Sequence, residues 1–162
     1  MTEQYIDVYG YHGTSEENAK LIDAGGFELS KDGYYGKGVY FYENNEKGLS
    51  YSINWARNIK KFENIGIVEA EIYCNIDLYL DITNPDYALK ERIKSFKMNG
   101  QDRNKSIKNL LKTFIKRVEQ ANQNEFDLFK VFVPEGMHKG WDCGYVVKTI
   151  KIIKKQRRVY YE

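Results

Sequence analysis

Hydrophobic and polar residues alternate near both ends of the chain and follow a helical period in the middle. Residues 65–82 alternate in a way that predicts one long strand, or two strands around Asn75–Asp77. Residues 104–121 carry apolar side chains three and four positions apart, which is typical of an amphipathic helix. Similar patterns predict strands at 8–12, 39–42, 129–133 and 145–153, and helices at 14–25, 46–60 and 86–97. This distribution indicates an α+β domain around an antiparallel-rich sheet.

The first predicted helix has signals at both ends. Thr14-Ser-Glu-Glu17 has the spacing of a capping box, in which the Thr14 hydroxyl accepts a hydrogen bond from a free backbone amide and Glu17 reciprocates. Gly25-Gly26 predicts the end of the helix, because glycine readily adopts the conformation that follows a last helical turn. A glycine-punctuated loop over residues 26–38 then leads into the strand at 39–42.

The composition is that of an ordinary globular domain. The 162 residues are 42% hydrophobic and 30% charged, and this length suits one domain, 1–162, with its own core. No stretch reaches the ~20 apolar residues that span a bilayer, and the start of the chain lacks the pattern of a secretory signal. The two histidines, His12 and His138, and two cysteines are too few for a structural zinc site. We therefore expect a cytoplasmic protein with no metal and no membrane contact.

The net charge of +2 hides an uneven distribution. Residues 1–100 hold 11 Lys and Arg against 16 Asp and Glu, whereas residues 101–162 hold 14 against 7. The excess positive charge falls in a predicted helix and near the last predicted strand. It indicates either solvated basic faces or a surface for nucleic acid or another acidic partner.

Three short motifs in the first third of the chain combine into a pattern. They are Tyr11-His-Gly-Thr14 at a strand end, Gly36-Lys-Gly-Val-Tyr-Phe41 entering a strand, and Tyr51 on the next helix. Taken singly, they are typical of a half-buried histidine, a turn and a core aromatic. Together they resemble the catalytic core of the ADP-ribosyltransferase fold, on its poly(ADP-ribose) polymerase-like side with a histidine–tyrosine motif. The resemblance covers residues 8–56, and residues 85–125 contribute nothing to it.

This resemblance implies a split, antiparallel-rich β-core flanked by helices, and a site for NAD as co-substrate. The backbone of Gly13 would bind the nicotinamide carboxamide, and the rings of Tyr40 and Tyr51 would stack on the two faces of nicotinamide. His12 would hydrogen-bond the adenosine ribose, with Thr14 adding a hydroxyl contact. The loop at 26–36 would lie along the pyrophosphate as a lid. Lys31 in this loop and Lys37 directly after it would soften the phosphate charge there. Ordinary loop solubility is the alternative for both lysines, and it is the simpler explanation of Lys31.

One element of the family pattern is missing. Polymerising members carry a glutamate at the start of a late strand, where it stabilises the positive charge that develops on the ribose. The late strand predicted at 145–153 has no acid, and Lys148 or Lys151 falls where the glutamate is expected. We expect Glu135, between Pro134 and Gly136, to replace it, with Asp142 as the second candidate. A plain surface turn is the alternative for Glu135.

The sequence therefore leads to three hypotheses. The first is a mono-ADP-ribosyltransferase that transfers ADP-ribose from NAD to a protein or nucleic acid. Stand-alone domains of this type often belong to bacterial or phage toxins and defence factors. The second is a catalytically silent module of the same fold that binds NAD, ADP-ribose or a related nucleotide. The third is a nucleic-acid-binding protein that shares only the fold, for which salt-dependent binding without NAD is expected.

Overall fold

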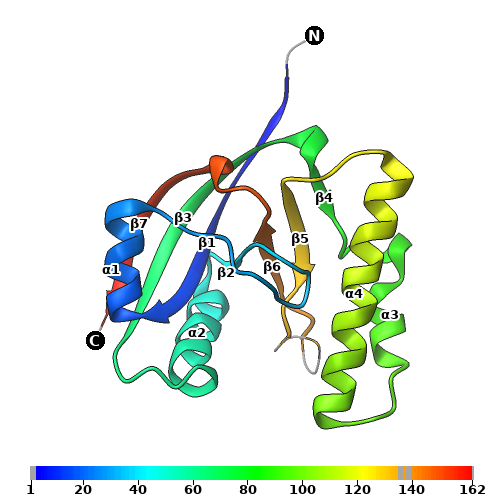
Figure 1. Cartoon of the computed structure of the whole chain (residues 1–162), viewed down its shortest axis with the longest axis horizontal. Coiled ribbons are helices and arrows are strands. Elements are labelled where there is room, and N and C mark those ends of the chain that lie inside the picture. Colours follow the sequence, from blue (N-terminus) through cyan, green and yellow to red (C-terminus); the bar gives the residue numbers. More distant parts are fainter. Residues whose placement is uncertain (1–2, 135–136, 138–139, 162) are drawn as a thin grey trace.

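A single sheet organises the described part of the chain, which comprises residues 3–134, 137 and 140–161 of the computed structural model (Figure 1). The strands are β1 (Tyr5–Ser15), β2 (Val39–Glu43), β3 (Ile65–Asn75), β4 (Tyr79–Asp81), β5 (Leu128–Phe132), β6 (Cys143–Val147) and β7 (Ile153–Tyr161). They lie in the order β4-β5-β6-β2-β1-β3-β7, and every neighbouring pair is antiparallel except β4 with β5. The helices are α1 (Glu16–Gly25), α2 (Glu46–Asn54), α3 (Leu89–Lys94) and α4 (Gly100–Asn122). The predicted α+β class with an antiparallel-rich sheet is confirmed.

Two hydrophobic clusters cover opposite faces of the sheet. Leu128 and Phe129 are neighbours on β5, yet Leu128 belongs to a cluster with α1 residues, and Phe129 to a cluster built on α3 and α4. Val146 and Val147 on β6 divide in the same way. Successive side chains of a strand point to opposite faces. Helix α1 therefore covers one face, and α3 and α4 cover the other.

The junction between β1 and β2 is short. Strand β1 pairs with β3 along its whole length, but with β2 only through Gly10–Glu43 and Tyr11–Tyr42. On its other side β2 pairs with β6 over most of its length. The sheet thus has two well-paired halves that a short ladder joins, and the ladder ends beyond Tyr11.

The first helix begins one residue later than its sequence predicts. Its cap is Ser15, whose hydroxyl accepts a hydrogen bond from the Asn18 backbone N–H at 3.1 Å. The predicted cap at Thr14 is wrong because Thr14 still belongs to β1, and its hydroxyl accepts from the Asn18 side chain at 2.8 Å. The predicted end is confirmed: Gly26 has φ of 90°, and its N–H donates to the Ile22 carbonyl at 2.7 Å.

The other helices differ from their predictions mainly at the ends. The pattern at 46–60 divides into α2 and a π-helical turn at Trp55–Ile59. The helix predicted at 86–97 is reduced to α3, because a 3-10 turn at Pro85–Tyr87 precedes it. The long helix predicted at 104–121 is confirmed as α4. None of the described helices is both long and apolar enough to cross a membrane.

The single strand predicted at 145–153 is wrong. Strand β6 ends at Val147, a 3-10 turn occupies Ile150–Ile152, and β7 then pairs with β3 at the other end of the sheet. The isoleucines of this turn continue the alternation of apolar and polar residues, so the pattern conceals the turn. A similar turn at Ile76–Leu78 separates β3 from β4, which confirms the two-strand alternative for residues 65–82.

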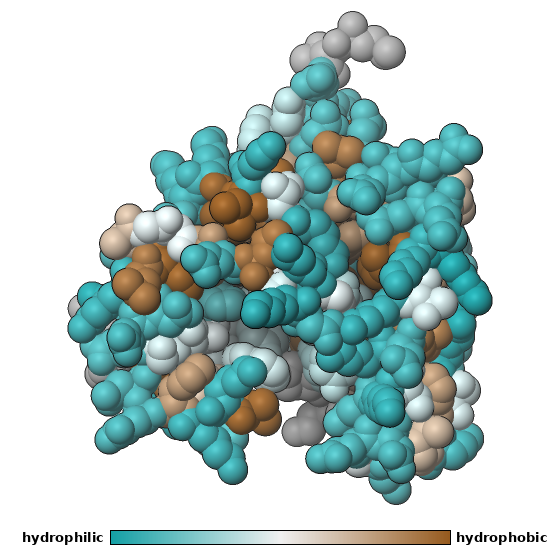
Figure 2. Space-filling view, in the orientation of Figure 1, coloured by the Kyte–Doolittle hydropathy of each residue, from teal (hydrophilic) through white to brown (hydrophobic). Residues whose placement is uncertain are grey.

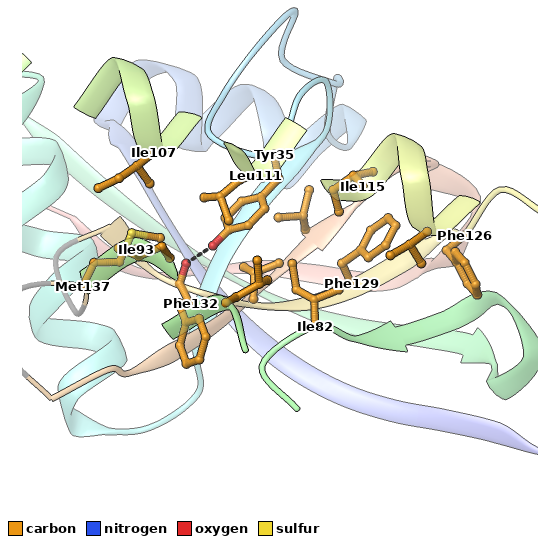
Figure 3. Close-up of a cluster of buried hydrophobic side chains, with 14 residues drawn as sticks. Tyr35, Ile82, Ile93, Ile107, Leu111, Ile115, Phe126, Phe129, Phe132 and Met137 are labelled. Atoms are coloured by element: carbon orange, nitrogen blue, oxygen red, sulfur yellow. Dashed lines mark hydrogen bonds between the residues drawn. The ribbon is translucent and has the colours of Figure 1, made fainter. Parts of the chain in front are cut away.

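The cluster beneath α3 and α4 is largely buried. Ile107, Leu111 and Ile115 recur at every fourth position of α4 and are at most 5% exposed. Figure 3 shows them above the sheet, around the ring of Tyr35. The Tyr35 hydroxyl donates a hydrogen bond to the Phe132 carbonyl at 2.5 Å. The loop between α1 and β2 is therefore anchored in this core.

Candidate functional site

A cavity of about 430 Å³, which we call the main cavity, lies where β1 and β2 diverge. Its walls come from the end of β1, the loop before β2, β2 itself, the turn after α2, helix α4 and the end of β5. Figure 2 shows the surface hollowed between α2 and α4, with mostly hydrophilic residues around the hollow. The aromatic side chains on its walls are Tyr34, Tyr35, Tyr40, Phe41, Tyr42, Trp55, Phe62, Phe132 and Tyr145. Volumes of ~300–1,000 Å³ with such linings are usual for small-molecule sites.

His12 lines this cavity and is held in one orientation. Its Nδ1 donates to the Tyr40 carbonyl oxygen at 2.8 Å, since a carbonyl can only accept. The ring also meets Phe27 and Phe41, with ring centroids 5.3 and 5.9 Å away. Burial lowers the pKa of His12, and the hydrogen bond to Tyr40 only partly opposes this. The neutral ring therefore keeps Nε2 as an acceptor.

Gly13 and Thr14 follow His12 on the cavity wall. A side chain at Gly13 would place its Cβ 2.2 Å from the Ser52 carbonyl oxygen, so glycine is required where α2 crosses β1. The close packing of α2 on β1 therefore explains why residue 13 is glycine without any reference to a ligand. The Thr14 hydroxyl is already engaged with Asn18, as described above, and Thr14 is 6% exposed.

Tyr40 links the cavity to the preceding loop. Its hydroxyl donates to the Gly36 carbonyl at 2.5 Å and accepts from the Tyr35 N–H at 3.0 Å. The ring lies so close to Gly33 that a Cβ there would be 2.3 Å from the Tyr40 hydroxyl oxygen. Burial raises the pKa of Tyr40 well above its usual value, so the phenol stays protonated. The aromatic ring is left to contribute to the cavity wall.

Tyr51 lies at a neighbouring pocket. Its hydroxyl donates to Asp142 Oδ2 at 2.5 Å, and both residues line a smaller hollow of about 180 Å³. Tyr42 takes the position beside the main cavity, and its ring centroid is 5.8 Å from that of Tyr51. The structure thus brings His12, Gly13, Thr14 and Tyr40 together, with Tyr51 behind Tyr42.

The late lysines and acids have separate environments. Lys148 follows β6, and its ammonium donates to the carbonyls of Tyr35 and Lys37 at 2.6 and 2.7 Å. Burial lowers the pKa of Lys148 to about 8. Lys151 lies in the turn before β7. Glu135 and His138 lie outside the described residues, although Pro134, directly before Glu135, lines the cavity.

The cavity has lysines that the motifs did not indicate. The lysines expected near phosphate, Lys31 and Lys37, have exposed side chains and are not part of its lining. Lys60 and Lys108 line it instead, together with the carboxylate of Asp32. The sequence signal for Lys108 was weak, because it lies in the segment without resemblance. Its position on an amphipathic helix that carries part of the excess positive charge of residues 101–162 was the signal for it.

A second hollow, of about 520 Å³, has the opposite electrostatic character. Asp7, Glu43 and Glu69 line it, and it shares Tyr145 with the main cavity. Three carboxylates would repel an anionic ligand. Burial is the main cause that raises the pKa of Asp7, and hydrogen bonding and repulsion from Glu71 add to it. An anionic ligand is therefore not expected in this hollow.

No group of three or more metal-binding side chains forms among the residues that the structure describes. No protein-family model matches the chain, and a search of curated proteins finds no significant match. The cavity and the residues that line it are therefore the basis for assigning a function.

Proposed function

We propose that the main cavity binds NAD and that the protein transfers one ADP-ribose unit to a protein or nucleic acid. The observation that carries this proposal is the meeting of His12, Gly13, Thr14 and Tyr40 on one aromatic-lined cavity. A flat aromatic ligand such as nicotinamide stacks favourably on tyrosine rings, at ~0.5–1.5 kcal/mol per ring beyond the area that it buries. His12 Nε2 offers an acceptor to a ribose hydroxyl.

The reaction breaks the C–N bond between ribose C1′ and nicotinamide. Nicotinamide leaves with the bonding electron pair, and positive charge develops on the ribose. An acceptor oxygen or nitrogen then bonds to C1′ and loses its proton. A fixed carboxylate would stabilise the intermediate charge. Glu135 is our candidate, because the residue directly before it, Pro134, lines the cavity.

A silent nucleotide-binding module is the second candidate, and a specific observation favours it. Among the described residues that line the cavity, Asp32 is the only carboxylate, and it is paired with Lys108 and Lys112. A carboxylate that two lysines hold is a poor stabiliser of a cation. Asp142 binds Tyr51 at the neighbouring pocket. Activity therefore requires a carboxylate from Glu135 or from the acceptor.

Binding is tested by thermal unfolding with nicotinamide or a benzamide, since a ligand of the native state raises Tm. We expect Tyr40→Ala to abolish the shift, and Tyr40→Phe to keep it because the ring remains. Tyr42→Ala should weaken the shift more than Tyr51→Ala, because Tyr42 lines the cavity. If all these folded variants keep the wild-type shift, nicotinamide binds elsewhere.

Transfer is tested by incubating the protein with labelled NAD and a cell lysate, and then separating proteins from nucleic acids. We expect label on one of these fractions. Glu135→Gln should lower turnover at least tenfold, about 1.4 kcal/mol of barrier, with nicotinamide binding unchanged. Asp142→Asn is the matched control and should retain more activity. Tight NAD binding without transfer to any acceptor would establish the silent module instead.

A further inference from the structure

Two lysines face the main cavity from different walls. Lys60 follows the π-helical turn after α2, and Lys108 lies on α4. The Lys60 ammonium lies 5.4 Å from the ring centroid of Trp55, which also lines the cavity. An ammonium against an aromatic face is held in a defined region without losing its charge. Both lysines can therefore present positive charge to a ligand between them.

The Lys108 side of the cavity already binds an anionic group. Asp32 Oδ2 is 2.8 Å from Lys108 Nζ, and Asp32 Oδ1 is 2.5 Å from Lys112 Nζ. The two lysines, together with a backbone hydrogen bond from Gly33, hold the pKa of Asp32 well below its usual range. The Asp32 side chain is 51% exposed. It can therefore swing away from Lys108 at little steric cost.

The two lysines of this ion pair differ in one respect. Lys108 lines the cavity, whereas Lys112, one helical turn further, is not part of its lining. A ligand phosphate can reach Lys108 while Lys112 keeps Asp32 and the loop attached to α4. Charge-assisted hydrogen bonds to phosphate are strong, so a dianionic pyrophosphate competes well with a single carboxylate.

We infer that Lys60 and Lys108 form the pyrophosphate-binding site of the cavity, and that Lys108 exchanges Asp32 for phosphate when the ligand enters. The inference rests on the proposed function, because that proposal is what identifies the ligand as a dinucleotide. It assigns a binding residue to α4, which lies outside the segment with the recognised motifs. Lys112 acts as the fixed partner that retains the loop.

The test measures binding by calorimetry with three probes: inorganic pyrophosphate, ADP-ribose and nicotinamide. We expect Lys108→Gln to weaken pyrophosphate and ADP-ribose at least about tenfold, with a smaller loss for Lys60→Gln. Nicotinamide has no phosphate, so its affinity should stay the same in both variants. Lys112→Gln is the matched control, because it removes the same charge from the same ion pair outside the cavity. It should change ADP-ribose affinity by less than about threefold.

The outcomes separate this inference from the proposed function. Equal losses in Lys108→Gln and Lys112→Gln would overturn it, because net charge alone would then explain the binding. Nicotinamide binding with no affinity for pyrophosphate or ADP-ribose would overturn the inference and leave the nicotinamide site standing. Pyrophosphate binding that depends on Lys108, without any affinity for NAD or nicotinamide, would support the anion site and remove the proposed function. Failure of all three probes would overturn both.

Discussion

The two walls of the cavity are held by different forces. On the wall from β1 and β2, polar side chains bond to main-chain carbonyls: His12 to Tyr40 at 2.8 Å, and Tyr40 to Gly36 at 2.5 Å. The wall from α4 is attached to the loop before β2 by ion pairs between Asp32 and two lysines. Helix α4 itself rests on the buried core described above. Hydrogen bonds thus fix the wall from β1 and β2. On the other wall, helix α4 is fixed by its core, but exposed ion pairs connect it to the loop.

This difference indicates which parts of the cavity can adjust. Partly buried hydrogen bonds to carbonyls depend on close geometry and are little affected by salt. Exposed ion pairs contribute little to stability and are screened by salt. We therefore expect the positions of His12 and Tyr40 to be set before a ligand binds, while the side chain of Lys108 rearranges above a helix that does not move. Four experiments test this comparison.

The largest effect is expected in the core beneath α4. Leu111 is fully buried, so Leu111→Ala should lower the free energy of unfolding by about 2–5 kcal/mol through lost burial and a residual cavity. Leu21→Ala, at a helix position 65% exposed, is the control and should cost under about 0.5 kcal/mol. Urea denaturation measures both. Equal losses would show that the α4 wall does not rest on a buried core.

The β1 wall is tested through the contact between β1 and α2. Gly13→Ala places a methyl group against the Ser52 carbonyl and should cost about 1–3 kcal/mol, with faster amide exchange in α2. Gly25→Ala is the control, because a Cβ there meets nothing within 4 Å. A Gly13→Ala variant as stable as Gly25→Ala would show that α2 does not pack closely on β1.

The pH dependence of stability tests the environment of His12. Burial places its pKa in the folded chain below the ordinary value of 6.5, so the unfolded chain binds the proton more readily. His12 therefore does not lower the free energy of unfolding above pH 6.5, where it is neutral in both states. As the pH falls below 6.5, the unfolded chain takes up the proton first and the folded state loses stability. Between pH 7.5 and 5 the wild type should lose more stability than His12→Gln. Parallel curves for the two proteins would contradict this environment.

The smallest effect is expected for the ion pairs of the α4 wall. Asp32→Asn should lower Tm slightly in dilute buffer, and the difference should vanish near 1 M NaCl, where the Debye length is only ~3 Å. Asp77→Asn, at another exposed carboxylate, serves as the control. A Tm difference that persists in high salt would mean that Asp32 contributes through geometry and not through charge.

Local signals in the sequence were sufficient for most elements. The spacing of Ile107, Leu111 and Ile115 located α4, and Gly25-Gly26 marked the end of α1. These signals depend on residues within a few positions of each other, as helical hydrogen bonds and strand alternation do. The same reasoning failed at the turn Ile150–Ile152, where alternation continued through a change of strand.

The cavity depended on contacts between distant residues. The motifs located His12 and Tyr40, but only the packing of the chain placed Tyr42 beside the cavity and directed Tyr51 to Asp142.

Asp32 and Lys108 are 76 positions apart, and no local pattern connects them. They meet because the core beneath α4 and the hydrogen bond of Tyr35 to the Phe132 carbonyl hold the loop against the helix. Contacts between residues so far apart depend on how buried surfaces pack together in three dimensions. The pattern of residues within a single segment does not predict that packing.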